Sequence, residues 1–255
     1  MEKISLAILV FACDTVEKYR LQMEAINNTW GKKCQEYPNI RIFYFLGEEL
    51  AEGDELVDTP STKYIHLQGV SNDYLSASYK QWLGLKYIYE HYRPNFTLCI
   101  GTDTYLNIPK MLSYLDAFNP EKSLYIGGHG DTRQIGPRPY YFHSGGPGFV
   151  ITLPILEKIF PFLQDIMNDW IRVCRTNEVD YLIGACDVGI SYYVAHICPE
   201  AKQIETGITF SNCNYLGIPC CVGKQVMSKI MSCHLMSLND FRDFTKILED
   251  NNYFM

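Results

Sequence analysis

The sequence predicts a mixed α/β fold, in which a sheet of buried strands is flanked by helices. An apolar run at residues 4–12 is followed by a helix-like stretch at 16–30 and a second apolar run at 40–46. This is the order of a βαβ unit. Strand-like and helix-like stretches then keep alternating to the end of the chain, and no repeat, low-complexity stretch or linker separates them. The 255 residues are therefore expected to form one unit.

The N-terminal elements follow from local signals. Residues 4–12 are almost all apolar, but the run is far shorter than the roughly 20 residues of a membrane-spanning helix, so we expect a buried strand. Asp14 and Thr15 are typical of a helix N-cap, and Gly31 is typical of a helix end. One helix is therefore predicted between them, followed by a second strand at 40–46.

The alternation continues through the rest of the chain. A short strand near 64–67 precedes a long, half-buried helix at 73–92, which should stop before Pro94 because the residue before a proline disfavours helical geometry. The other expected elements are strands at 96–100, 124–128 and 149–151, and helices at 108–118, from Pro154, from Asp187 to Ile197, and at 238–248.

Composition narrows the class of protein. With 47% hydrophobic residues the chain can bury a large core. Its formal net charge of -7 argues against a nucleic-acid partner, because binding to a phosphate backbone depends on clustered Lys and Arg.

The cysteines and the glycosylation sequons bear on the cellular compartment in which the protein is expected. The ten cysteines form no CxxC pair, so most are expected to be buried free thiols, although Cys220 and Cys221 are adjacent. The Asn-x-Thr sequons at Asn27 and Asn95 fall in a predicted helix and beside a predicted strand. Without an export signal or a membrane span, a reducing cytoplasmic setting is expected.

Three polar residues stand out against this framework: Asp103 after the strand at 96–100, Asp187 at a predicted helix start, and His234. Open α/β folds bind ligands at the carboxyl ends of strands, and a carboxylate there can hold a divalent cation. Each residue also has an ordinary structural interpretation, as a turn aspartate, an N-cap aspartate and a hydrogen-bonded surface histidine. Spacing alone does not decide between the two interpretations.

A glycine-rich segment, Ser144–Gly148, lies before the strand at 149–151. It removes side chains from a cleft wall, so we expect a ligand or another backbone to come close. The segment matches neither the phosphate loop nor the dinucleotide fingerprint, and the chain has no GxSxG elbow. Residues 11–14 lack the glycines and lysines expected of a sugar-phosphate nucleotidyltransferase.

A series of short motifs runs in order along nearly the whole chain. They are Arg20 with Thr29-Trp30-Gly31, Phe45-Leu46-Gly47, Asp73-Tyr74 with Ser78-Tyr79-Lys80, Gly101-Thr102-Asp103-Thr104-Tyr105, Tyr125-Ile126-Gly127-Gly128, Ser144–Val150, Cys186-Asp187-Val188 and Cys233-His234-Leu235. Each motif is weak alone, but together and in this order the chain resembles glycosyltransferase family 31, which contains Fringe-type, core-1 galactosyltransferase-like and β1,3-galactosyltransferase-like enzymes.

That resemblance implies the GT-A fold, a Rossmann-like nucleotide-binding mixed sheet flanked by helices and joined to an acceptor-binding half. Residues 1–255 would form one catalytic domain. Its nucleotide-sugar-binding half would span about 1–105, and its acceptor-binding half, with a C-terminal metal-ligand segment, about 106–255. The implied activity is inverting, metal-dependent transfer from a UDP-sugar donor to a hydroxyl of a glycan or glycoprotein acceptor, forming a β1,3 linkage.

The resemblance also implies roles for individual residues. Asp103 and His234 would hold Mn²⁺, and Asp187 would be the catalytic base. A single displacement needs one base and no enzyme nucleophile, which agrees with the lack of a serine or cysteine triad. The residues implied in donor binding are Ala12, Arg20, Lys80, Thr102, Asp103, Gly145 and Gly146.

The chain departs from the family pattern in three ways. Gly101 and Thr102 replace the first two positions of the acidic DxD motif, and Cys186 replaces one member of a later acidic pair. These changes leave open a degenerate domain that binds nucleotide or glycan without turnover. Relatives are typically anchored in the secretory pathway, whereas this chain begins almost at its first strand, so a cytoplasmic protein is expected and a trimmed secretory-pathway catalytic domain is the alternative.

Overall fold

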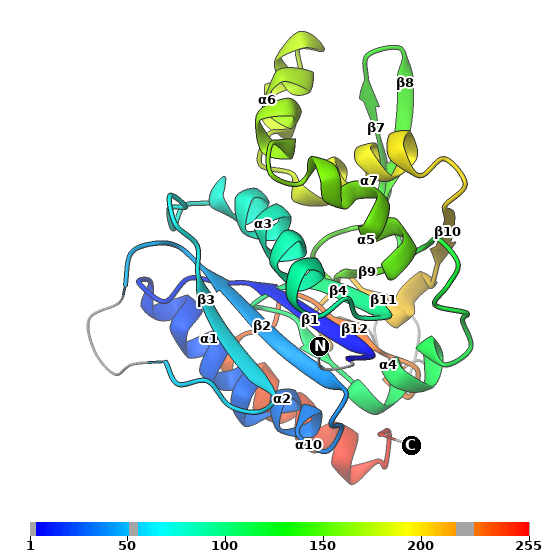
Figure 1. The fold of residues 1–255 in the computed structure, drawn as a ribbon. Helices are drawn as coiled ribbons and strands as arrows, with labels where there is room; N and C mark the ends of the chain where they lie inside the picture. Colours follow the sequence, from blue (N-terminus) through cyan, green and yellow to red (C-terminus); the bar gives the residue numbers. More distant parts are fainter. Residues whose placement is uncertain (1–3, 51–55, 218–226, 255) are drawn as a thin grey trace.

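The computed structural model describes residues 4–50, 56–217 and 227–254, and its centre is a seven-stranded sheet (Figure 1). The strand order is β10-β6-β9-β4-β1-β2-β3. β9 is antiparallel to both of its neighbours, and the other pairs are parallel. The strands are β1 (Leu6–Phe11), β2 (Ile40–Leu46), β3 (Thr62–His66), β4 (Phe96–Gly101), β6 (Leu124–Gly127), β9 (Phe149–Thr152) and β10 (Lys202–Glu205).

Helices cover both faces of this sheet (Figure 1). One face packs on α1 (Glu17–Asn28), α2 (Trp30–Cys34), α4 (Ile108–Leu115) and α10 (Leu238–Asp250). The other face packs on α3 (Ser76–His91), α5 (Leu153–Ile159), α6 (Ile166–Thr176) and α7 (Cys186–Ile197). Along β1, Ile8 and Val10 enter the first core and Ala7 and Leu9 the second. A strand buried on both faces needs the continuous apolar sequence seen there.

Two smaller sheets complete the fold. A three-stranded sheet has the order β11-β12-β5 and consists of β11 (Phe210–Ser211), β12 (Ser232–Cys233) and β5 (Tyr105–Leu106). A hairpin of β7 (Asp131–Ile135) and β8 (Arg138–Phe142) stands beside α7 (Figure 1). Short 3₁₀ turns are η1 (Phe160–Phe162), η2 (Asp180–Leu182) and η3 (Gly207–Thr209).

The region after β1 differs from the sequence prediction. Two helices replace the single predicted one, and Gly31 lies inside α2 instead of ending a helix. A Cβ at Gly31 would lie 2.7 Å from the Ile26 carbonyl oxygen, so glycine here permits close packing of α2 against α1. The N-cap of α1 is Val16, with no side-chain cap, so the predicted capping by Asp14 and Thr15 is wrong.

Several elements had not been assigned from the sequence, or have other bounds. The hairpin β7–β8 and helix α6 were not predicted. Helix α3 begins at Ser76 and not at Asp73, because the Asp73 carboxylate accepts a hydrogen bond from the Ser76 backbone N–H (2.8 Å). Asp73 therefore stands in front of the helix, as a capping side chain does.

The cysteines and the first sequon lie mainly inside the protein. All eight cysteines within the described ranges are free thiols, and six of them are buried; Cys220 and Cys221 lie outside these ranges. Asn27 donates to the Tyr64 hydroxyl (2.7 Å) and accepts from the Tyr44 hydroxyl (3.0 Å), so its amide is part of the packing between α1 and the sheet. In the part of the chain that the structure describes, no helix is long and apolar enough to cross a membrane.

Candidate active site

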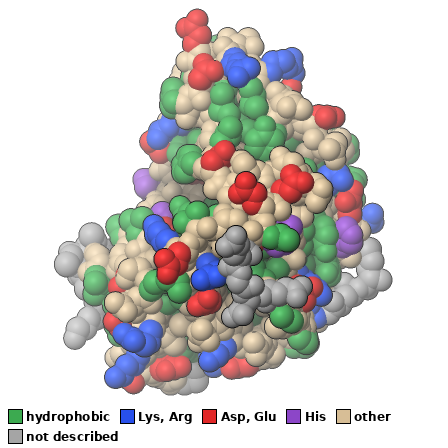
Figure 2. Space-filling model, turned by 90° about the vertical axis from the view of Figure 1, so that its left-hand side faces the viewer, with side chains coloured by type: hydrophobic (Ala, Val, Ile, Leu, Met, Phe, Trp, Pro, Cys, Tyr) green, Lys and Arg blue, Asp and Glu red, His purple; other side chains and the backbone are tan. Residues whose placement is uncertain are grey.

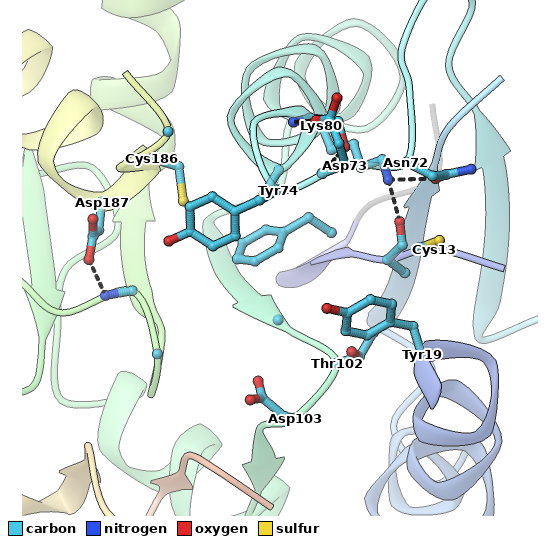
Figure 3. A pocket seen from close by; sticks show the side chains of 18 of the residues that line it. Cys13, Tyr19, Asn72, Asp73, Tyr74, Lys80, Thr102, Asp103, Cys186 and Asp187 are labelled. Carbon is cyan, nitrogen blue, oxygen red and sulfur yellow. Dashed lines mark hydrogen bonds between the residues drawn. The ribbon is translucent and has the colours of Figure 1, made fainter. Parts of the chain in front are cut away.

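A cavity of about 470 Å³ lies at the carboxyl ends of β1 and β4 (Figure 3). β1 pairs in parallel with β2 on one side and with β4 on the other, so the strand order reverses between β1 and β4. Open α/β sheets form ligand crevices at such points. The sequence-predicted site residues that line the cavity are Ala12, Lys80, Thr102, Asp103, Gly145, Gly146, Asp187 and His234.

Asp103 and His234 meet at one end of the cavity. Asp103 lies between β4 and β5, and His234 follows β12 directly. β5 and β12 pair antiparallel, with Tyr105 opposite Cys233, and the Met236 N–H donates to the Asp103 carbonyl oxygen (3.0 Å). This register brings His234 Nε2 to 3.4 Å from Asp103 Oδ2. The pairing of two short strands therefore joins residues that are far apart in the sequence.

The surroundings of the Asp103 carboxylate favour its charged form. Burial raises its pKa, but hydrogen bonding and the charge of His234, with a smaller contribution from Lys18, lower the pKa below the ordinary value. The Asp103 and His234 side chains remain 34% and 23% exposed, so both can reach a ligand in the cavity.

This end of the cavity fits a divalent cation. Carboxylate oxygen and imidazole nitrogen are both suitable donors for Mn²⁺. Within residues 4–50, 56–217 and 227–254, no group of three or more His, Cys, Asp or Glu side chains is arranged to hold a metal ion. A cation here would therefore take its remaining ligands from water and a bound phosphate group, as cations held by one or two side chains do.

Asp187 lies at the other end, in the first turn of α7 (Figure 3). Its Oδ2 accepts from the Gly145 N–H (2.8 Å), and its Oδ1 accepts from the Val188 N–H (2.9 Å). Burial raises the pKa of this carboxyl group, although both backbone hydrogen bonds oppose the rise. Ala185 and not Asp187 is the N-cap of α7, so the N-cap interpretation of Asp187 does not apply.

Two of the three glycines in the glycine-rich segment lie against the two ends of the cavity. A Cβ at Gly145 would lie 3.0 Å from the Asp187 Cβ, and a Cβ at Gly146 would lie 2.3 Å from His234 Nδ1. Among the protein atoms around these two glycines, side chains therefore make the closest approach. At Gly148 the expectation of a nearby backbone is correct, because a Cβ there would lie 2.8 Å from the Cys99 carbonyl oxygen and φ is +89°.

Lys80 is buried beside the end of β1. Its ammonium donates to the Ala12 carbonyl oxygen (2.7 Å) and to Asn72 Oδ1 (2.9 Å), and burial lowers its pKa (Figure 3). Asn72 Oδ1 also accepts from the Gly47 N–H (3.1 Å). Lys80 therefore connects the ends of β1 and β2, and its charge is largely engaged within the protein.

Two other predicted donor-binding residues have different surroundings. The Thr102 hydroxyl is buried and donates to Gln22 Oε1 (2.6 Å), which ties the loop after β4 to α1. Arg20 is not among the described residues that line the cavity, and its buried Nε has no hydrogen-bond partner in the described structure. The structure thus brings eight of the predicted residues to one cavity and leaves Arg20 outside it.

Other residues in the cavity wall were not assigned to the site from the sequence, among them Lys18, Tyr19, Asn72 and Tyr74. Lys18 and Tyr19 belong to the first turn of α1, and the Lys18 ammonium lies 5.6 Å from the centroid of the Tyr19 ring. Tyr74 belongs to the Asp73-Tyr74 motif, but nothing in its spacing distinguishes a cavity residue from a core residue. On the face shown in Figure 2, acidic, basic and apolar side chains are intermixed.

Comparison with known proteins gives a consistent result. The Fringe-like family profile matches residues 4–190. Chondroitin sulfate synthase 3 from Mus musculus is 27% identical over 154 residues, and the corresponding human protein is 26% identical over 135 residues. The matches cover 57% and 50% of this chain, but only 17% and 15% of those proteins.

A solved structure with the same arrangement is the crystal structure of a glycosyltransferase involved in the glycosylation of the major capsid of PBCV-1. The TM-score is 0.52, and the alignment covers 95% of this chain and 99% of that chain. Sequence identity is 13%, so this likeness concerns the fold alone.

Proposed function

Because the chain belongs to the Fringe-like family, within glycosyltransferase family 31, and is a glycosyltransferase with the GT-A fold, we propose that it is an inverting, metal-dependent enzyme. It would transfer a sugar from a UDP-sugar to an acceptor hydroxyl and form a β1,3 linkage. One observation carries this proposal: Asp103 with His234 and, separately, Asp187 line the same cavity at the carboxyl ends of β1 and β4. A donor with a charged leaving group needs a site that holds a cation, and an acceptor that must lose a proton needs a base. The two ends of the cavity differ in this way.

The end with Asp103 would receive the diphosphate of the donor. Asp103 and His234 would hold Mn²⁺, which when bound supplies positive charge against the charge that develops on the leaving UDP. Lys18 is exposed in the cavity wall and adds a positive charge close enough to affect Asp103. Lys80 supports this end indirectly, because its hydrogen bond to the Ala12 carbonyl oxygen orients the end of β1.

The end with Asp187 would bind the acceptor hydroxyl. A carboxylate whose pKa is raised is a better proton acceptor than an ordinary aspartate, and burial raises the pKa of Asp187. Backbone N–H groups from Gly145 and Val188 hold the carboxylate in one orientation, and each oxygen retains a lone pair. Asp187 is thus both oriented and basic.

The proposed step is a single displacement. The acceptor oxygen forms a bond to the anomeric carbon while its proton moves to Asp187. The bond from the anomeric carbon to the phosphate oxygen breaks, and UDP leaves with the electron pair. Attack from the face opposite the leaving group inverts the configuration, so an α-linked donor yields a β-linked product.

A panel of nucleotide sugars tests the proposal. Purified protein is incubated with UDP-galactose, UDP-N-acetylglucosamine, UDP-glucose and matching GDP-sugars, with Mn²⁺ or with EDTA, and release of the nucleotide is measured. Mn²⁺-dependent release of UDP from at least one UDP-sugar is expected. Binding of UDP without release or transfer would instead indicate a degenerate binding domain, and no binding of UDP would refute the proposal.

A further inference from the structure

Tyr74 is the most exposed large aromatic residue among those that line the cavity. Its side chain is 84% exposed, although tyrosines usually bury most of their ring. It precedes α3 and lies across from the start of α7 (Figure 3). An exposed aromatic side chain inside a ligand cavity is informative, because one face of its ring is available to a bound molecule.

Part of the Tyr74 ring lies close to the protein backbone. A Cβ at Gly184 would lie 3.3 Å from Tyr74 Cε1 and 3.4 Å from Cδ1, so the ring lies close to the backbone before α7. The Tyr74 hydroxyl points toward the wall formed by Cys186 and Asp187 (Figure 3). Partial burial raises the pKa of Tyr74, and the nearby Cys186 and Asp187 raise it further.

The position of Tyr74 indicates which of the two substrates, donor or acceptor, its ring would contact. Donor phosphates belong near Asp103 and His234, and Lys18 lies in the cavity wall within electrostatic reach of Asp103. Tyr74 is instead near Asp187, the group that would take the proton of the acceptor. An exposed ring beside the base is suited to hold the molecule that arrives from solvent.

We propose that Tyr74 is the platform for a carbohydrate acceptor, on whose exposed ring face a pyranose lies while one of its hydroxyls reaches Asp187. This inference rests on the proposed function and assigns Tyr74 as a positioning residue for its acceptor. A pyranose has a face of axial C–H groups that matches an aromatic ring, and the Tyr74 hydroxyl can bond to a ring substituent at its edge. A serine or threonine side chain offers no comparable flat apolar face.

Acceptor binding and turnover test this inference. Methyl β-galactoside, methyl β-glucoside, methyl N-acetyl-β-glucosaminide and a serine/threonine-containing peptide are each offered to the UDP–Mn²⁺-loaded protein. Saturation-transfer NMR measures binding, and transfer is measured with the preferred UDP-sugar. Wild type should bind and glycosylate at least one pyranoside, and Tyr74→Ala should raise its Kd and KM roughly tenfold, since the lost ring contact and ring stacking act together.

Two variants keep the result interpretable. Tyr74→Trp retains an aromatic face and should keep the pyranoside affinity within about threefold of wild type. Phe162→Ala truncates a 51% exposed aromatic residue that is not in the cavity wall, and it should change neither Kd nor KM. Since Tyr74 is mostly exposed, Tyr74→Ala should fold, which an unchanged Tm will establish.

The outcomes separate this inference from the proposed function. If wild type does not bind UDP, the proposed function itself fails. If UDP binds but no pyranoside does, or only the peptide is glycosylated, the platform role of Tyr74 is wrong. The same holds if Tyr74→Ala weakens UDP binding while leaving pyranoside binding unchanged, since the ring would then serve the donor.

Discussion

The two ends of the cavity place a carboxylate in opposite environments. Asp103 is paired with His234, which lowers the pKa of its carboxyl group in spite of burial. Asp187 accepts hydrogen bonds from two backbone N–H groups, and burial raises its pKa in spite of them. The same side chain therefore loses its proton more readily at one end and is a stronger base at the other.

The difference between Asp103 and Asp187 shows how one cavity can provide both a cation-binding carboxylate and a base. A carboxylate with a lowered pKa suits the binding of a cation, whereas one with a raised pKa suits the removal of a proton. Neither property belongs to aspartate itself, since both come from the neighbours. Changes that act on one end only can thus test the assignment of roles.

The largest effect is expected at the basic end. Asp187→Asn keeps the size and one acceptor oxygen but cannot take a proton, so kcat for transfer should fall by about 10² to 10⁴. The UDP Kd, measured by calorimetry with Mn²⁺, should remain near wild type because the other end is unchanged. An equal loss of UDP binding and turnover would show that Asp187 has a structural role only.

A smaller loss is expected at the cationic end. Asp103→Asn should weaken Mn²⁺-dependent UDP binding by about 10- to 100-fold, because a neutral amide is a poorer ligand for a hard cation than a carboxylate. Titration of Mn²⁺ against UDP binding measures the effect, with His234→Ala as a companion variant. If both variants keep the wild-type Mn²⁺ dependence, the metal site lies elsewhere.

The pH dependence of turnover should report Asp187. The base works only when deprotonated, so kcat should fall about tenfold for each pH unit below its pKa. Burial raises that pKa above the ordinary 3.8, so the fall should begin at a higher pH than for an exposed aspartate. The residual activity of Asp187→Asn should lack this acid limb, and if the limb persists in that variant, another group is responsible.

The smallest and most discriminating effects are expected from the two glycines. Gly146→Ala would press on the His234 ring and Gly145→Ala on the Asp187 side chain. The first should mainly weaken Mn²⁺-dependent UDP binding and the second should mainly lower kcat, each by roughly tenfold or less. Identical effects of both substitutions on both quantities would mean that the two ends are not independent.

Local signals in the sequence were sufficient to predict many of the strands and helices of the fold. The central strands were predictable because each is a nearly continuous apolar run, and α10 is preceded by Ser237, whose capping box marks its start. The hairpin β7–β8 was not predictable, since most residues of β7 are exposed and follow no apolar alternation. The break between α1 and α2 was missed because the reason for Gly31 is a contact between helices.

For the candidate site, the sequence by itself determined which residue types stand at the ends of β4 and β12, at the start of α7 and before β9. These features depend on short-range propensities and on the order of motifs. Only the tertiary structure decided that β5 pairs with β12 and so places His234 beside Asp103, that burial raises the pKa of Asp187, and that Tyr74 stays exposed in the cavity wall. Each of these depends on contacts between segments distant in the chain, because burial and strand register are properties of the packed molecule.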